Sequence, residues 1–195
     1  MTSPRLVLAS ASPRRRELLS RLVPAFDVVP AALEEVLPVP ATPAAVAALA
    51  LAKAQAVAAG LAAGVVLGAD TEVVLGGEPL GKPADPEQAR AMLRRLRGRV
   101  HEVITGLALV EAATGRRAST AVVSRVVMRD YPDEAIEAYV ASGEGADKAG
   151  AYAIQGRGAD LVAGYVGSYT NIVGLPLAET RRMLVEFGIV VRERA

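Results

Sequence analysis

The sequence predicts an α/β fold with a mixed sheet. Short apolar runs that suit buried strands alternate irregularly with stretches whose apolar residues recur at helical spacing. The chain has 195 residues, which suits one domain or one domain with two lobes. A chain of this size buries about 70% of the surface of its unfolded form, so its core needs no disulfide or metal. The sequence contains no internal repeat, low-complexity tail or linker.

The first elements are short. Residues 5–9 form an apolar run that ends in a turn-like cluster, which predicts a buried strand. Ser12 and Pro13 are typical of an N-cap and the first helical position, and Leu18, Leu19 and Leu22 then follow at helical spacing. Residues 26–29 favour a second short strand.

The middle of the chain alternates helix and strand. Thr42 and Pro43 begin an Ala-rich helix that we expect to end near Gly60. A buried strand follows over residues 65–67 and ends at residues 68–71. Residues 73–75 continue extended into the turn Gly76–Gly77. A third helix begins at Asp85-Pro86, presents Ala89, Met92, Leu93 and Leu96 on one face, and ends at Gly98.

The last third begins with strands over residues 103–111 and 119–128, joined through Thr114-Gly115. Pro132 begins a helix that we expect to reach Ala141. The Gly-rich stretch 143–167 is too interrupted for long elements. The last helix begins at Leu175-Pro176 and runs through Phe187.

Composition excludes several classes of protein. The formal net charge is +1, whereas a dedicated nucleic-acid binder normally has a strongly basic face. The absence of Cys excludes a disulfide scaffold, a zinc-thiolate site and a thiol nucleophile, and it fits a cytoplasmic protein. The apolar run at residues 6–9 is too short for a signal peptide. Residues 41–69 are rich in Ala and contain Lys53 and Gln55, so we expect no membrane span.

Two phosphate-binding motifs fail on inspection. Residues 76–82 match a P-loop until its eighth place, where Pro83 replaces the Ser or Thr that would hold magnesium. Residues 156–158 begin a dinucleotide fingerprint, but Leu161 replaces its third glycine. The single histidine, His101, has no Ser nucleophile in a suitable context, and we interpret it as a surface residue at a strand end. Metal binding therefore depends on carboxylates, which favour Mg²⁺ or Mn²⁺.

The turn at residues 10–15 lies between a strand and a helix start. Free N–H groups and the helix dipole bind anions at such a position, and the arginines there would add charge. The alternative is an ordinary N-cap with solvated arginines, and the residues alone leave both open. Asp70 follows a buried strand, where a carboxylate can hold a metal or activate water, or can simply cap a turn.

Three lysines are ambiguous by themselves. Taken alone, Lys53 is typical of a lysine whose stem packs on apolar surface while its ammonium reaches water, with a phosphate ligand as the alternative. Lys82 and Lys148 each lie in a Gly-containing segment.

Several segments, in order along the chain, resemble the signatures of the Maf family, the septum-formation-like nucleotide pyrophosphatases. They read LASASPRRRELL (8–19), LGADT (67–71) with LGKP (80–83), DKAGAYAIQG (147–156), and GSY (167–169) with VGLPL (173–177). The resemblance covers nearly the whole chain. It implies an inosine-triphosphate-pyrophosphatase-like fold: an elongated mixed sheet with flanking helices and a cleft between two lobes, in one domain over residues 1–195. It also implies a homodimer.

The resemblance implies hydrolysis of nucleoside triphosphates to the monophosphate and pyrophosphate with a divalent metal cation. Asp70 would be the catalytic acid-base residue. Glu35 or its neighbour Glu34 would help Asp70 to hold the metal. The residues that would contact phosphates are Ser10, Arg15, Lys53 and Lys82, and Arg14 would help to neutralise the triphosphate.

The family divides by substrate, and three positions are informative. The branch that prefers dTTP and UTP carries Arg, Thr and Gln where this chain has Arg14, Thr71 and Gln155. The branch that prefers 7-methyl-GTP typically carries Trp, Gln and Glu at the same three positions. The amide of Gln155 offers a donor and an acceptor to the imide edge of a pyrimidine. We therefore expect dTTP and UTP as substrates, with modified pyrimidines as an extension. The alternatives are a non-catalytic nucleotide-sensing regulator of cell division, and the same enzyme acting on modified purine nucleotides.

Overall fold

The computed structural model describes residues 4–33 and 36–192, and it contains one mixed sheet of seven strands. The strand order is β2-β1-β3-β5-β6-β7, and β4 pairs with β3 outside this path. β1 is parallel to β2 and β3, whereas β3, β5, β6 and β7 are antiparallel to one another in turn. The strands are β1 (Leu6–Leu8), β2 (Asp27–Val28), β3 (Val65–Leu75), β4 (Glu78–Pro79), β5 (Val100–Glu111), β6 (Arg117–Met128) and β7 (Val162–Val166). The predicted α/β class with a mixed sheet is confirmed.

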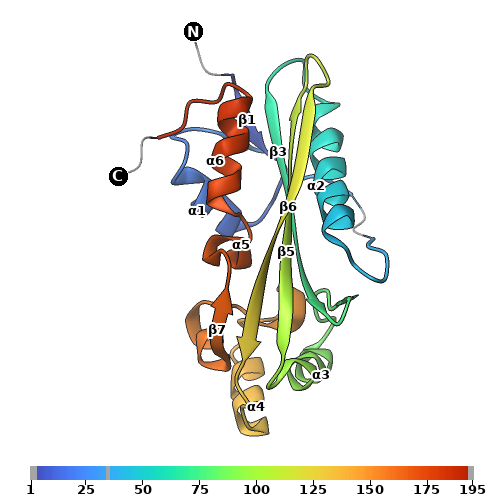
Figure 1. Ribbon diagram of the computed structural model, residues 1–195, viewed down its shortest axis with the longest axis vertical. Coiled ribbons are helices and arrows are strands. Elements are labelled where there is room, and N and C mark those ends of the chain that lie inside the picture. Colours follow the sequence, from blue (N-terminus) through green and yellow to red (C-terminus); the bar gives the residue numbers. More distant parts are fainter. Residues whose placement is uncertain (1–3, 34–35, 193–195) are drawn as a thin grey trace.

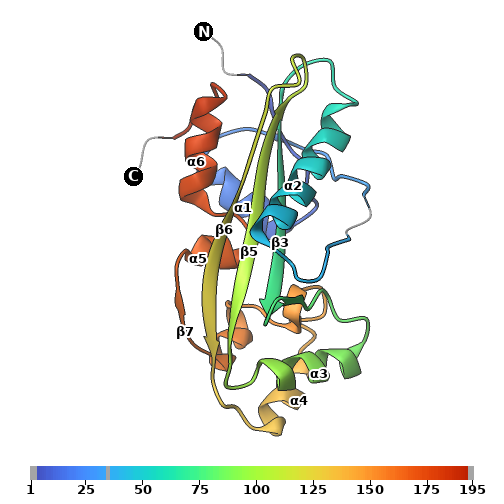
Figure 2. The same ribbon diagram turned by 45° about the vertical axis from the view of Figure 1, so that its right-hand side comes forward.

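Helices cover both faces of this sheet (Figure 1). They are α1 (Pro13–Ser20), α2 (Pro43–Ala58), α3 (Pro86–Leu96), α4 (Asp133–Ala141), α5 (Tyr169–Val173) and α6 (Leu177–Glu186). Figures 1 and 2 show an elongated molecule in which α1, α5 and α6 lie on one face and α2 on the other, with α3 and α4 at one end. No helix in the described residues combines the length and apolar character that a membrane span needs.

Local signals in the sequence set the starts of three helices. The side chains of Ser12, Thr42 and Asp85 accept hydrogen bonds from backbone N–H groups three residues on, and a proline follows each at the first helical position. These caps satisfy donors that the first helical turn leaves without partners. The predicted starts of α1, α2 and α3 are therefore confirmed.

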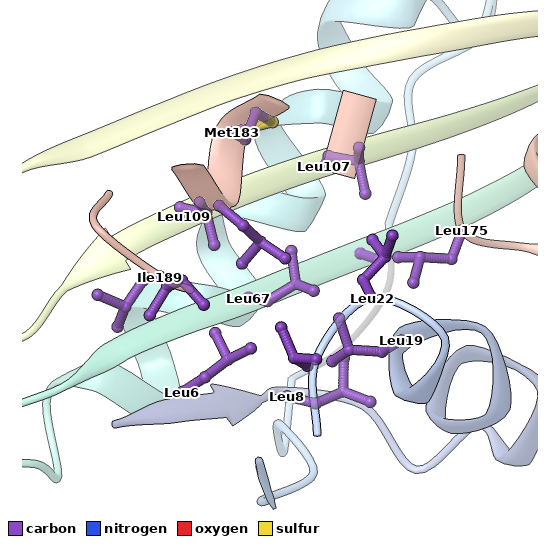
Figure 3. Close-up of a cluster of buried hydrophobic side chains, with 14 of the residues drawn as sticks. Leu6, Leu8, Leu19, Leu22, Leu67, Leu107, Leu109, Leu175, Met183 and Ile189 are labelled. Carbon is purple, nitrogen blue, oxygen red and sulfur yellow. The ribbon is translucent and has the colours of Figure 1, made fainter. Parts of the chain in front are cut away.

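The apolar core lies along the sheet in separate clusters. One joins strand residues such as Leu8, Leu67 and Leu109 to Leu19 of α1 and Met183 of α6, and Figure 3 shows these side chains meeting. Another packs α3 and α4 against the opposite end of the strands. Ile154 packs against both clusters, so the segment that contains it lies where they meet.

Two glycines bring α2 unusually close to the sheet. A Cβ atom on Gly68 of β3 would lie 2.2 Å from the carbonyl oxygen of Ala50, and one on Gly106 of β5 would lie 2.3 Å from that of Val46. Because both obstacles are helix backbone, only glycine fits at these positions. The small side chains of Ala50 and Ala54 complete the contact.

The C-terminal third differs most from the prediction. The stretch 143–167 contains the short 3₁₀ helices η1 (Ala149–Ala151) and η2 (Gly156–Leu161), as an interrupted segment should, but it also contains the unpredicted strand β7. Helix α5 is likewise unpredicted. Both are only five residues long, which is too short for an apolar period to emerge, and β7 is a largely exposed edge strand.

Candidate active site

A cavity of about 390 Å³ gathers the residues that the sequence singled out. It lies among the turn after β1, the start of α1, the middle of β3, and the segments around residues 147–155 and 172–174. The predicted site residues that line it are Ser10, Arg14, Arg15, Lys53, Asp70, Thr71, Lys82 and Gln155. Glu34 and Glu35 lie outside the described residues.

The register of β3 explains why two of these residues reach one cavity. β1 pairs with β3 only from Leu6 opposite Val65 to Leu8 opposite Leu67. β3 then continues to Leu75, so no strand among residues 4–33 and 36–192 covers its edge beside Asp70 and Thr71. Successive strand residues point to opposite faces. Asp70 accordingly contacts α2, whereas Thr71 contacts α1 on the other face, and both border the space beyond the end of β1.

Lys53 and Asp70 form a buried ion pair. The Lys53 Nζ donates to Asp70 Oδ1 at 2.5 Å, and the two side chains are 8% and 4% exposed. The interpretation of Lys53 as a surface lysine, drawn from the helix alone, is therefore wrong. The close approach of α2 at Gly68 and Gly106 brings the helix within reach of β3. The second carboxylate oxygen, Asp70 Oδ2, is buried and has no hydrogen-bond partner among the described residues.

Within the described residues, the Arg15 guanidinium donates to three neutral acceptors. Its Nη1 donates to Ser10 Oγ at 3.2 Å, its Nη2 to Thr71 Oγ1 at 3.0 Å, and its Nε to the carbonyl of Gly174 at 3.0 Å. Ser12 meanwhile caps α1 by accepting from the backbone N–H of Arg15. Ser12 is therefore an N-cap, whereas Arg15 lies in the cavity and not in open solvent.

A lysine that the sequence left ambiguous also lines the cavity. Lys148 is 16% exposed in its side chain, and its Nζ lies 2.5 Å from Asp147 Oδ1, a carboxylate that is 79% exposed. The described lining therefore has five cationic side chains against two carboxylates: Arg14, Arg15, Lys53, Lys82 and Lys148 against Asp70 and Asp147. Such an excess of cations suits a polyanionic ligand.

His101 is buried, which corrects the prediction of a surface histidine. It is 2% exposed, and its Nε2 lies 2.7 Å from the hydroxyl of Tyr152, which lines the cavity. Burial lowers the pKa of His101 to about 4, so the ring is neutral at physiological pH. Burial also raises the pKa of Tyr152 above its usual range. The signal in the sequence was its place in β5, whose alternate residues Val103 and Thr105 are also buried.

The donors in the cavity fit a hard divalent cation. No group of three His, Cys, Asp or Glu side chains is assembled within residues 4–33 and 36–192. Mg²⁺ needs no such group, because it is commonly held by one or two carboxylates together with substrate phosphates and water. Asp70 Oδ2 is a buried carboxylate oxygen with no partner among the described residues, which is the donor that such an ion requires.

Comparison with known proteins gives a consistent result. The Maf-like protein family matches residues 5–187. A relative from Moorella thermoacetica is 55% identical over 188 residues, covering 96% of this chain and 97% of its own. Relatives from Myxococcus xanthus and Pelotomaculum thermopropionicum are 51% and 49% identical, over 97% and 94% of this chain and 96% of each of theirs. All three carry the name dTTP/UTP pyrophosphatase.

Proposed function

This chain belongs to the Maf-like protein family, and we propose that it hydrolyses dTTP and UTP to the nucleoside monophosphate and pyrophosphate. Relatives that match it over nearly their whole length are named for that activity. The family and these names support a nucleoside triphosphate pyrophosphatase.

The observation that carries the proposal is the half-satisfied carboxylate of Asp70. Lys53 fixes one oxygen and leaves Oδ2 buried, at the cavity, without a described partner. A nucleotide sensor has no use for such a group, because an unpaired carboxylate beside a polyanion weakens binding. A hydrolase does, since the oxygen can orient a water molecule and accept its proton.

In the proposed reaction, a carboxylate handles the proton and cationic side chains bind the phosphates. Water attacks the α-phosphorus, the bond between this phosphorus and the bridging oxygen breaks, and pyrophosphate leaves. Asp70 takes the proton of the attacking water. Arg15 and Lys82 bind phosphate oxygens, so that charge on the leaving pyrophosphate meets positioned cations. Lys53 holds the Asp70 carboxylate in place from α2.

A divalent cation completes the proposal. Asp70 would hold it together with phosphate oxygens, and Glu35 is the further ligand that the family resemblance implies. When bound, such an ion lowers the pKa of water and neutralises phosphate charge. A carboxylate is a weak base by itself, so this contribution would be needed at neutral pH.

The base of the substrate is assigned to Gln155. Gln155 lies in the cavity with Ala153 and Ile154, and its amide can donate to and accept from a pyrimidine imide. Replacement by Gln155→Glu removes the donor. We expect that variant to lose kcat/KM for UTP relative to 7-methyl-GTP, and an unchanged preference would refute this assignment.

A pyrophosphate-release screen tests the activity directly. Purified protein is incubated with Mg²⁺ or Mn²⁺ and each of dTTP, UTP, CTP and the purine triphosphates, and pyrophosphate and monophosphate are quantified. We expect release with dTTP and UTP, and none when the cation is chelated. Tight nucleotide binding without release would support the nucleotide-sensing alternative instead. Light scattering on the same sample tests the homodimer that the family resemblance implies.

A further inference from the structure

Thr105 is a buried threonine beside the site, and the proposed reaction gives it no role. It lies on β5 directly opposite Thr71 of β3, and its side chain is fully buried. It does not line the cavity. Its hydroxyl nevertheless stands in a chain of hydrogen bonds that begins at Arg15, which does.

The direction of each hydrogen bond follows from counting protons. Thr105 Oγ1 lies 3.0 Å from the backbone carbonyl of Asn171, which can only accept, so the single proton of Thr105 goes there. Thr105 Oγ1 must then accept from Thr71 Oγ1, 2.9 Å away. The proton of Thr71 is thereby committed, and its oxygen is left as an acceptor for Arg15 Nη2 at 3.0 Å.

The alternative arrangement is poorer. If Thr105 donated to Thr71, the 3.0 Å contact with Asn171 would lack a proton. Thr71 would then have to donate to the carbonyl of Gly174 at 3.5 Å, a distance at which a hydrogen bond is weak. The chain therefore runs in one direction, from Arg15 through Thr71 and Thr105 to the carbonyl of Asn171.

The far end of this chain is rigidly attached to the sheet. Asn171 is fully buried, and its Nδ2 donates to the carbonyl of Val103 at 3.0 Å and to Ser124 Oγ at 2.9 Å. Its backbone carbonyl is thus held between β5 and β6. An acceptor fixed in this way fixes the rotamer of the Thr105 hydroxyl, and through it the lone pair that Thr71 presents to Arg15.

We propose that Thr105 is a positioning residue for triphosphate binding, because it sets the hydrogen-bond polarity of Thr71 and so aims the Arg15 guanidinium into the cavity. The inference rests on the proposed function, since it takes Arg15 as a phosphate ligand. Thr71 then positions the Arg15 guanidinium, in addition to any contact with the base of the nucleotide. Mobile arginines lose entropy on binding, so a guanidinium that is held in advance binds phosphate more tightly.

The test removes only the hydroxyl. Thr105→Val keeps the shape of the side chain, and we expect KM for dTTP to rise about tenfold, the equivalent of one hydrogen bond, with kcat changed less than about twofold. Thr105→Ser restores the hydroxyl and should restore KM. Thr180→Val is the matched control, because Thr180 is also fully buried and donates to a backbone carbonyl, that of Pro176, the N-cap residue of α6.

A double-variant cycle separates positioning from a general structural effect. In an Arg15→Met background, Thr105→Val should raise KM no further, because its target is gone. Additive effects, or wild-type KM in Thr105→Val, would overturn the inference. If Thr105→Val does not fold, Thr105→Ala compared with Thr105→Ser asks the same question, since that pair differs only in the hydroxyl.

Binding of inorganic tripolyphosphate, measured by calorimetry, distinguishes this inference from the proposed function. Weaker binding to Thr105→Val in a protein that releases no pyrophosphate would leave the inference standing and refute the function. Equal binding to both proteins, or no binding to the wild type, would overturn the inference whatever the activity.

Discussion

Replacing Lys53 by methionine isolates the energetic role of the buried ion pair with Asp70. Both side chains are less than a tenth exposed, and their charged atoms are 2.5 Å apart. Methionine keeps the apolar stem but leaves the Asp70 carboxylate buried without this cation. Removing one partner of a buried pair costs about 3–5 kcal/mol. We expect Lys53→Met to lower the free energy of unfolding by about 3 kcal/mol, measured by equilibrium urea denaturation at neutral pH.

Two further variants make the origin of that loss clear. The double variant Lys53→Met/Asp70→Asn removes both charges, and most of the lost stability should return, since replacing a buried pair as a whole is often nearly neutral. Arg21→Met breaks an exposed pair with Glu17 and should cost less than about 1 kcal/mol. A loss below about 1 kcal/mol for Lys53→Met, or no recovery in the double variant, would refute the reasoning.

Three more predictions follow from burial and close packing. Gly68→Ala places a Cβ atom 2.2 Å from helix backbone, so it should lower the free energy of unfolding, measured by urea denaturation, by about 3 kcal/mol and lower activity by shifting Lys53. The control Gly164→Ala, whose Cβ atom meets nothing within 4 Å, should leave both nearly unchanged. His101 binds its proton with a pKa of 6.5 when unfolded and about 4 when folded, so the stability due to the neutral ring is complete above pH 6.5 and is lost as the pH falls toward 4. That loss amounts to about 3 kcal/mol, measured as the difference in pH profile between wild type and His101→Gln, and parallel profiles would contradict it. Asn171→Ala removes the Nδ2 donor that ties α5 to Val103 and Ser124, so it should destabilise the fold by about 2 kcal/mol and raise KM for dTTP, as Thr105→Val does. A loss of stability with unchanged KM would show that Asn171 does not hold the hydrogen-bond chain that ends at its carbonyl.

Much of the fold could be predicted because its signals are local. A Ser, Thr or Asp followed by proline marks the starts of α1, α2 and α3, and the apolar face of α3 is visible at helical spacing. Asp70 was a candidate because it follows a buried apolar run. β7 and α5 could not be found in this way, since five residues carry too little periodicity.

The pairings within the site could not be predicted from spacing alone. α2 is apolar almost all round, so nothing in its own sequence shows which face Lys53 occupies. That face is set by Gly68 and Gly106, two residues on other elements that admit the helix backbone. The burial of Thr105 gave no local signal, and that of His101 was visible only in the alternation along β5. The burial of both depends on α5 and on the segment around Tyr152 packing over β5.

The central claim is that Asp70 performs the chemistry while the surrounding cations bind the triphosphate. Pyrophosphate release from dTTP by Asp70→Asn, measured beside nucleotide binding to the same preparation, tests it most directly. We predict a loss in kcat of about 10²–10⁴-fold, the range of general acid–base catalysis, with nucleotide affinity changed only a few-fold. Turnover at the wild-type rate, or loss of binding and turnover together, would contradict the account.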